Sequence, residues 1–153
     1  MEIPTGLLRW TNRIDVAAAR RFGWSLGSRA LGVPVAVLHT TGAKTGKART
    51  SIVTWAPGHP GDGDEAGTSG QIVVGGGAGG RRQVPDWVAN LRAHAELRVT
   101  IDTRTYQAIA REPSGSERET AKNRLLAVWP RAAAYEHQSG RPLPIFVIDR
   151  AEQ

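Results

Sequence analysis

The 153-residue chain contains no cysteine, which excludes disulfide scaffolds, thiolate metal sites and cysteine nucleophiles together. Aromatic residues make up only 6%, so the chain lacks the interleaved stacking side chains on which single-stranded nucleic acid binds. No apolar run approaches the roughly 20 residues that cross a bilayer, and the N-terminus lacks the short apolar core of a signal peptide. We therefore expect a cytoplasmic protein.

The sequence also lacks the motifs of several kinds of catalytic site. The chain has no G-x-S-x-G sequence and no paired-carboxylate motif, and its four histidines are scattered, so we expect no metal site. Basic charge, in contrast, is abundant, because the net charge is +6 and 17 of the 20 basic residues are arginine. This charge favours an acidic partner, and nucleic acid, an anionic membrane surface and a polyanionic coenzyme all remain open.

Length and composition indicate a single globular domain with one core. Residues 6–30 carry apolar side chains at roughly helical spacing with arginines between them, which predicts one or two basic amphipathic helices. Such a helix either packs on its own domain or lies on the inner membrane surface. We expect residues 1–33 to form this segment and residues 34–153 to form the rest of the domain.

The remainder alternates short β-branched segments with turns and with helical patterns. The expected strands are 35–41, 50–56, 71–74, 96–102, 105–111 and 145–149, and the expected helices are 85–94, 114–129 and 132–139. Ser114 and Glu117 have the spacing of a capping box at the start of the second helix. This order predicts an α+β domain with a six-stranded, mainly antiparallel sheet or barrel.

The sequence TTGAKTGKART, at positions 40–50, joins the first two expected strands. Lys44, Lys47 and Arg49 supply positive charge there, and the glycines let backbone N–H groups approach an anion. The segment therefore predicts a phosphate site, with a solvated basic turn as the alternative.

Two nucleotide-binding motifs are excluded. An NTPase phosphate loop needs four residues before Gly-Lys, then a magnesium-binding hydroxyl and a helix, whereas this loop has three residues, Ala48 and a strand. GGGAGG, at 75–80, matches G-x-G-x-x-G, but residues 81–85 separate it from the next helix, so no helix dipole meets a pyrophosphate.

Three motifs occur in order: T-T-G-x-K-[ST]-G-x-x-R at 40–49, P-x-W-x-x-N-L at 85–91 and R-x-[IL]-P-[IV] at 141–145. In these the chain resembles the deazaflavin-dependent nitroreductase family, small bacterial enzymes that use coenzyme F420, an 8-hydroxy-5-deazaflavin with a phosphate and an oligoglutamate tail. The resemblance covers roughly residues 35–149. It implies a split β-barrel similar to FMN-binding oxidases of the pyridoxine-phosphate oxidase type.

The resemblance also implies a coenzyme site. Lys44 and Arg49 would hold the phosphate, and Trp87 would pack near the ring, while Asn90 would either contact the coenzyme or only cap or bridge loops. The implied coenzyme-binding residues are Ala43, Lys44, Thr45, Lys47, Arg49, Thr50, Ser51, Ile52, Val53, Gly75, Gly76, Gly77, Ala78, Asp86, Trp87, Val88, Ala89 and Asn90.

The implied substrate pocket contains Trp129, Ala132 and Tyr135, with Tyr135 completing protonation or positioning the substrate. The reaction implied is hydride transfer from reduced F420 to a quinone or an activated enone. The family usually has a serine at the position of Gly77 and tyrosines at those of Trp129 and Ala132, so we do not expect efficient reduction of nitroimidazoles. The alternatives are a non-catalytic protein that binds F420 or FMN, and a basic nucleic-acid-binding domain.

Overall fold

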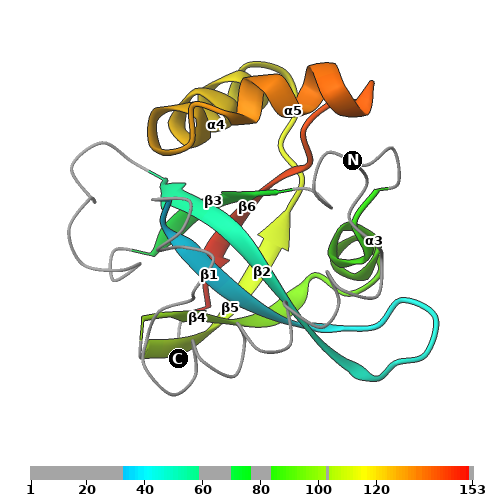
Figure 1. Cartoon of the computed structure of the whole chain (residues 1–153). Coiled ribbons are helices and arrows are strands. Elements are labelled where there is room, and N and C mark those ends of the chain that lie inside the picture. Colours follow the sequence, from blue (N-terminus) through cyan, green and yellow to red (C-terminus); the bar gives the residue numbers. More distant parts are fainter. Residues whose placement is uncertain (1–32, 59–69, 77–83, 103, 152–153) are drawn as a thin grey trace.

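A computed structural model of the protein describes residues 33–58, 70–76, 84–102 and 104–151 (Figure 1). Its strands are β1 (Val35–Thr41), β2 (Ala48–Pro57), β3 (Gln71–Gly75), β4 (Glu96–Ile101), β5 (Arg104–Arg111) and β6 (Ile145–Arg150). Its helices are α3 (Asp86–Ala93), α4 (Gly115–Val128) and α5 (Ala132–Ser139). The helix expected within residues 6–30, and Gly77 and Ala78, lie outside the described residues.

The six strands form a closed antiparallel barrel in the order β1-β2-β3-β6-β5-β4. The barrel closes where β1 pairs with β4, with Leu38 opposite Val99. The last strand, β6, lies between β3 and β5. The α+β barrel predicted from the sequence is therefore confirmed.

Alternation along the strands fills the barrel interior. Leu38, Val53 and Val74 point inward from the first three strands and are at most 2% exposed. Leu97, Val99 and Ile101 are buried together on β4, as their spacing predicted. Because successive side chains of a strand point to opposite faces, the residues between these positions face outward.

Two of the helices cover one outer side of the barrel. Figure 1 shows α4 and α5 lying together over β2, β3 and β6, while α3 lies at another side, beside the β1–β2 hairpin. Leu125 of α4 and Tyr135 of α5 pack with Val73 and Val147 from the outward faces of β3 and β6. Within the described residues, no helix is long and apolar enough to cross a membrane.

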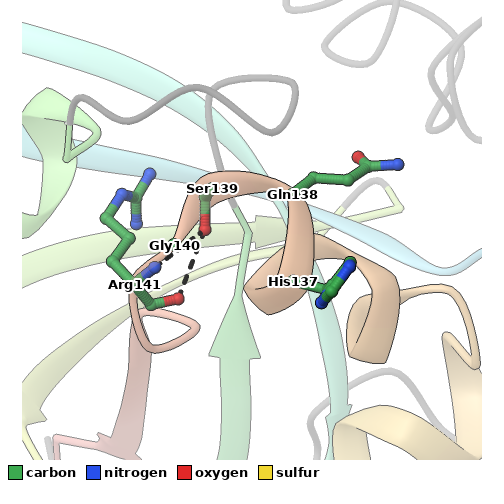
Figure 2. Close-up of a pocket in the computed structure, with 5 residues that line it drawn as sticks. All are labelled: His137, Gln138, Ser139, Gly140 and Arg141. Atoms are coloured by element: carbon green, nitrogen blue, oxygen red, sulfur yellow. Dashed lines mark hydrogen bonds between the residues drawn. The ribbon is translucent and has the colours of Figure 1, made fainter.

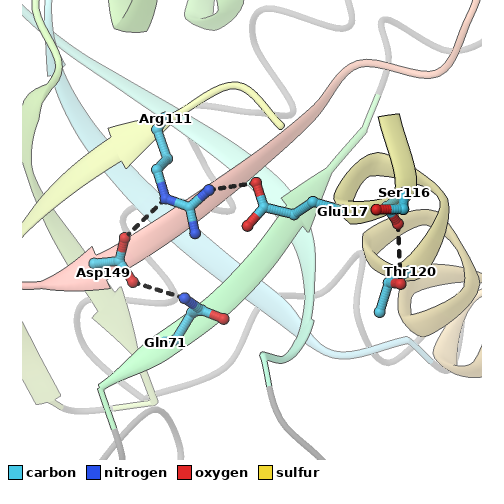
Figure 3. Close-up of polar contacts among 6 residues, drawn as sticks. All are labelled: Gln71, Arg111, Ser116, Glu117, Thr120 and Asp149. Carbon is cyan, nitrogen blue, oxygen red and sulfur yellow. Dashed lines mark hydrogen bonds and ion pairs between the residues drawn. The ribbon is translucent and has the colours of Figure 1, made fainter. Parts of the chain in front are cut away.

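The capping box predicted from Ser114 and Glu117 is wrong. Ser114 does occupy the N-cap of α4, but its side chain makes no capping hydrogen bond. The Glu117 carboxylate instead accepts a hydrogen bond from Arg111, which also donates to Asp149 at 3.3 Å (Figure 3). The arginine on β5 offers that carboxylate a charged donor, which makes a stronger bond than a neutral backbone amide.

Candidate functional site

The turn between β1 and β2 is shorter than the sequence suggested, because β2 begins at Ala48, opposite Thr41. Residues 42–47, here called the basic turn, are closed by hydrogen bonds from Gly42 N–H to Lys47 O at 2.8 Å and from Gly46 N–H to Gly42 O at 2.9 Å. Gly46 has φ +67°, a left-handed backbone conformation that residues other than glycine rarely adopt. The basic turn therefore has a defined shape.

Positive charge gathers on this turn. Lys44 and Lys47 are exposed within it, and Arg49 is exposed on the following strand. Arg49 lies opposite Thr40, whose side chain belongs to the inward face of β1. The side chain of Arg49 therefore leaves β2 on the inward face, the same face that lines the barrel interior further along the strand.

The register divides the predicted residues of β2 between two faces. Arg49, Ser51 and Val53 alternate onto the inward face, where Ser51 is opposite Leu38. Ile52 instead packs outside the barrel against Val37. Thr50 shares this outward face, so Thr50 and Ile52 can offer a ligand on the inward side only their backbone groups.

The predicted part of β2 also extends beyond the end of β3. The last β2–β3 pair joins Thr54 to Gly75, so within the described residues the part of β2 before Thr54 pairs with β1 alone. A Cβ added at Gly76 would lie 3.8 Å from Val53 Cα, so the backbone of Gly76 lies close to that strand. The structure thus brings Gly76 beside Val53 on the inward face of β2.

Helix α3 contributes both core and site residues. Trp87 is 5% exposed and packs edge-on against Phe146 with ring centroids 5.6 Å apart, and Val88 is also buried in the core. Asp86 and Ala89 are exposed on the other side of the helix. Asn90 is buried and accepts a hydrogen bond from Ala43 N–H at 2.9 Å, so it connects α3 to the basic turn.

The predicted substrate-pocket residues lie together at the two C-terminal helices. Ala132 and Tyr135 are buried, and the rings of Trp129 and Tyr135 are 6.5 Å apart. Arg141 donates a hydrogen bond to the Tyr135 hydroxyl and lies 5.1 Å from its ring centroid. Burial raises the pKa of Tyr135, although Arg141 opposes this shift, so the phenol stays protonated at neutral pH.

A separate polar concavity lies at the end of α5 (Figure 2). Its volume is about 420 Å³. Ser139 Oγ donates to Arg141 O at 3.2 Å and accepts from Arg141 N–H at 3.4 Å, which shapes the turn after the helix. The lining residues are His137, Gln138, Ser139, Gly140 and Arg141. This concavity includes none of the predicted site residues.

Sequence reasoning missed two contributors to these groups. Thr40 is 4% exposed and lies under Asn90, whose Nδ2 is 3.4 Å from its hydroxyl oxygen. Arg141 belongs to the motif at 141–145, but its contact with Tyr135 depends on how α5 ends. Among the residues that the structure describes, no group of three His, Asp or Glu side chains could hold a metal ion.

The residues fit a flat, phosphorylated coenzyme. The exposed cations and the defined backbone of the basic turn match a phosphate. Gly76 adds no side chain beside the inward face of β2, so its backbone can approach a flat ring. Among the site residues that the structure describes, no nucleophile has an adjacent base, so the arrangement suits binding and positioning better than covalent catalysis.

Comparison with known proteins agrees with this fit. A model of the F420H(2)-dependent quinone reductase family matches residues 10–150. The F420H(2)-dependent quinone reductase of Mycobacterium tuberculosis (strain ATCC 25618 / H37Rv) is 26% identical over 147 residues, which span 90% of this chain and 89% of that protein.

Solved structures are similar as well. One described as an F420-H2 dependent reductase, FDR-A, has a TM-score of 0.62 at 26% identity and covers 76% of this chain and 94% of its own. Another, described as a domain-swapped dimer, has a TM-score of 0.64 at 24% identity over 96% of this chain and 100% of its own. The second likeness is one of fold alone.

Proposed function

We propose that this chain, which belongs to the F420H(2)-dependent quinone reductase family, passes a hydride from its reduced coenzyme to a quinone or an activated enone. The chain is an oxidoreductase, and F420 is its coenzyme. The choice of acceptor and the residue roles are the proposed part. One observation supports the coenzyme site: the basic turn is hydrogen-bonded to α3 at Asn90, and Gly76 lies beside Val53 on the inward face of β2.

The basic turn holds the coenzyme phosphate in this proposal. Lys44 and Arg49 bind it directly, and Lys47 adds charge for the acidic tail. Ser51 and Val53 line the ring from the inward face of β2, while Thr50 and Ile52 contribute backbone groups only. The remaining proposed contacts come from Ala43 and Thr45 in the turn, from Gly75, Gly76, Gly77 and Ala78, and from Asp86, Trp87, Val88 and Ala89 on α3.

When bound, the reduced deazaflavin supplies a hydride at C5. The protein's part is to hold donor and acceptor in line and to exclude water. Trp129, Ala132 and Tyr135 are the proposed acceptor-side residues. Ala132 and Tyr135 are buried where α4 and α5 pack on the barrel, so the partly buried Trp129 has the most surface to offer an acceptor. The buried, Arg141-bonded hydroxyl of Tyr135 supports a positioning role more than proton donation.

Titration of the purified protein with F420 tests the site. We expect Lys44→Ala and Arg49→Ala each to weaken binding by about 1.5–3 kcal/mol, the range for hydrogen bonds to charged groups. The fold should persist, because both side chains are exposed. Arg98→Ala is the matched control, since Arg98 is an exposed cation on the outward face of β4. Unchanged affinity in both turn variants would contradict the phosphate site.

A panel of acceptors tests the reaction. We expect F420H2 oxidation with a soluble naphthoquinone and with a cyclic enone, and little with a bicyclic nitroimidazole, because Gly77 and Ala132 lack polar side chains. Efficient nitroimidazole turnover would contradict this substrate range. Binding of F420 without turnover of either preferred acceptor would instead favour another class of acceptor.

A further inference from the structure

We propose that Asn90 is a positioning residue that fixes the basic turn in its coenzyme-binding shape before the coenzyme arrives. This inference rests on the proposed role of the turn as the phosphate site. It assigns Asn90 an action through the turn, in contrast to direct contact with the coenzyme.

The hydrogen bonds of Asn90 support this assignment. Its Oδ1 accepts from Ala43 N–H at 2.9 Å, and Ala43 immediately precedes Lys44. Its Nδ2 is 3.4 Å from Oγ1 of Thr40, on the inward face of β1. One amide therefore contacts both the last inward-facing residue of β1 and the start of the basic turn.

Asn90 is held rigidly by its helix. Trp87, Val88 and Leu91 anchor α3 in the barrel core, and each is at most 5% exposed. Asn90 itself is 6% exposed, which leaves little of its side chain for a ligand. Loss of the amide would leave buried polar groups unpaired as well as releasing the turn.

The position of the turn explains why such an anchor matters. The β1–β2 hairpin projects from the barrel beside α3 in Figure 1, and the lysines of the turn are exposed. Backbone hydrogen bonds within the turn set its local shape, but the bond to Asn90 sets its place relative to α3 and the core. A cation that is already in place loses less conformational entropy on binding phosphate.

A double-mutant cycle tests the inference. We expect Asn90→Ala to raise the dissociation constant for F420 about tenfold in the native background. In a Lys44→Ala, Arg49→Ala background the same change should raise it less than about twofold, because the cations that it positions are gone. Asn123→Ala, at an exposed amide on α4, is the matched control and should leave affinity unchanged in both backgrounds.

Amide hydrogen exchange gives a second readout that needs no coenzyme. The Ala43 amide should be protected in the native protein and lose at least tenfold of that protection in Asn90→Ala, while amides in the core strands stay protected. Thr40→Val removes only the weaker contact and should raise the dissociation constant about two- to threefold. This milder variant provides the test if Asn90→Ala fails to melt cooperatively.

Three results would overturn the inference. Equal losses in the two backgrounds would mean that Asn90 contacts the coenzyme directly. An unprotected Ala43 amide in the native protein would mean that the turn is not anchored. Unchanged affinity for F420 in both Asn90→Ala and Thr40→Val would mean that the anchor does not contribute to coenzyme binding. Failure of the native protein to bind F420 would refute the proposed function, whereas the exchange result would still decide whether Asn90 anchors the turn.

Discussion

Glu136 connects three parts of the chain through one carboxylate. Its Oε2 pairs with Lys122 Nζ of α4 at 2.9 Å, and its Oε1 accepts from Leu143 N–H, before β6, also at 2.9 Å. Burial alone would raise the pKa of Glu136, but the hydrogen bond from Leu143 and the charge of Lys122 outweigh it and lower the pKa below 4.5. The charged form therefore stabilises the folded state.

We expect Glu136→Gln to lower the free energy of unfolding by about 1 kcal/mol at pH 7. Because the folded-state pKa is lowered, the stabilisation is fully present above pH 4.5 and is lost as the pH falls through the lower folded value. The difference between native and variant proteins should therefore shrink from pH 5 to pH 3. Denaturant unfolding across this range measures it.

Glu119→Gln serves as a control for the general effect of removing a carboxylate, because Glu119 is exposed on α4. A difference between the native protein and Glu136→Gln that stayed constant down to pH 3 would contradict the predicted linkage.

The sequence predicted the charges of the basic turn at the scale of single residues, because cations and glycines cluster there within a few positions. It left the role of Asn90 open, since a hydrogen bond to Ala43 joins residues far apart in the chain. The pairing of Arg141 with Tyr135 was likewise hidden, because it depends on where α5 ends. The sequence thus predicts residues that cluster within a few positions, but it does not predict contacts between residues that folding brings together.

The contact between α4 and the barrel depends on a missing side chain. A Cβ built at Gly75, the last residue of β3, would lie 2.6 Å from Leu125 Cδ1 and 3.0 Å from Pro144 O. Leu125 is fully buried and Pro144 O is backbone, so neither can withdraw freely. Glycine at this position therefore permits close packing of α4 over the end of β3.

We expect Gly75→Ala to destabilise the protein by about 1–3 kcal/mol, the usual range for overpacking a core. Denaturant unfolding at neutral pH measures this change. Gly76→Ala is the matched control, because its added Cβ would lie 3.8 Å from the nearest atom, an ordinary contact distance. It should leave stability nearly unchanged and weaken F420 binding. Equal stability of the two variants would contradict the packing argument.

At the scale of elements, the sequence predicted the strands and helices of the described region, because turn residues and changes of periodicity mark their ends. It could not predict that β1 pairs with β4 or that β6 lies between β3 and β5, since pairing across the barrel leaves no local signal. The sequence predicted the start of α4 at Ser114 but not the absence of the capping hydrogen bond, for the same reason. Ser114 is near Glu117 in the sequence, but the Glu117 carboxylate accepts its hydrogen bond from Arg111 of β5, which also donates to Asp149 of β6 (Figure 3).

For the whole molecule, the segments assigned to the coenzyme all follow residue 40, whereas the expected basic amphipathic segment precedes β1. Coenzyme binding and the membrane contact that we propose for residues 6–30 would therefore use separate parts of the chain. We expect deletion of residues 1–30 to preserve F420 binding and to raise the KM for a lipophilic quinone presented in anionic vesicles. Steady-state kinetics and coenzyme titration measure the two effects.

The KM for a water-soluble quinone should stay unchanged by the same deletion, which controls for damage to the site. Loss of F420 binding together with the cooperative melt would contradict the prediction and would mean that the N-terminal segment belongs to the core. In that case the positive charge of the segment would have no role at a membrane.

The place of β6 in the barrel constrains how the protein can be synthesised. Pairings such as Gln71 with Asp149 join distant parts of the chain, so long loops must close before these contacts form. While the chain leaves the ribosome, β3 and β5 each lack their shared neighbour until residues 145–150 emerge. Unpaired strand edges invite association with other chains. The nascent protein is therefore vulnerable to aggregation until residues 145–150 have been made and β6 has joined the barrel.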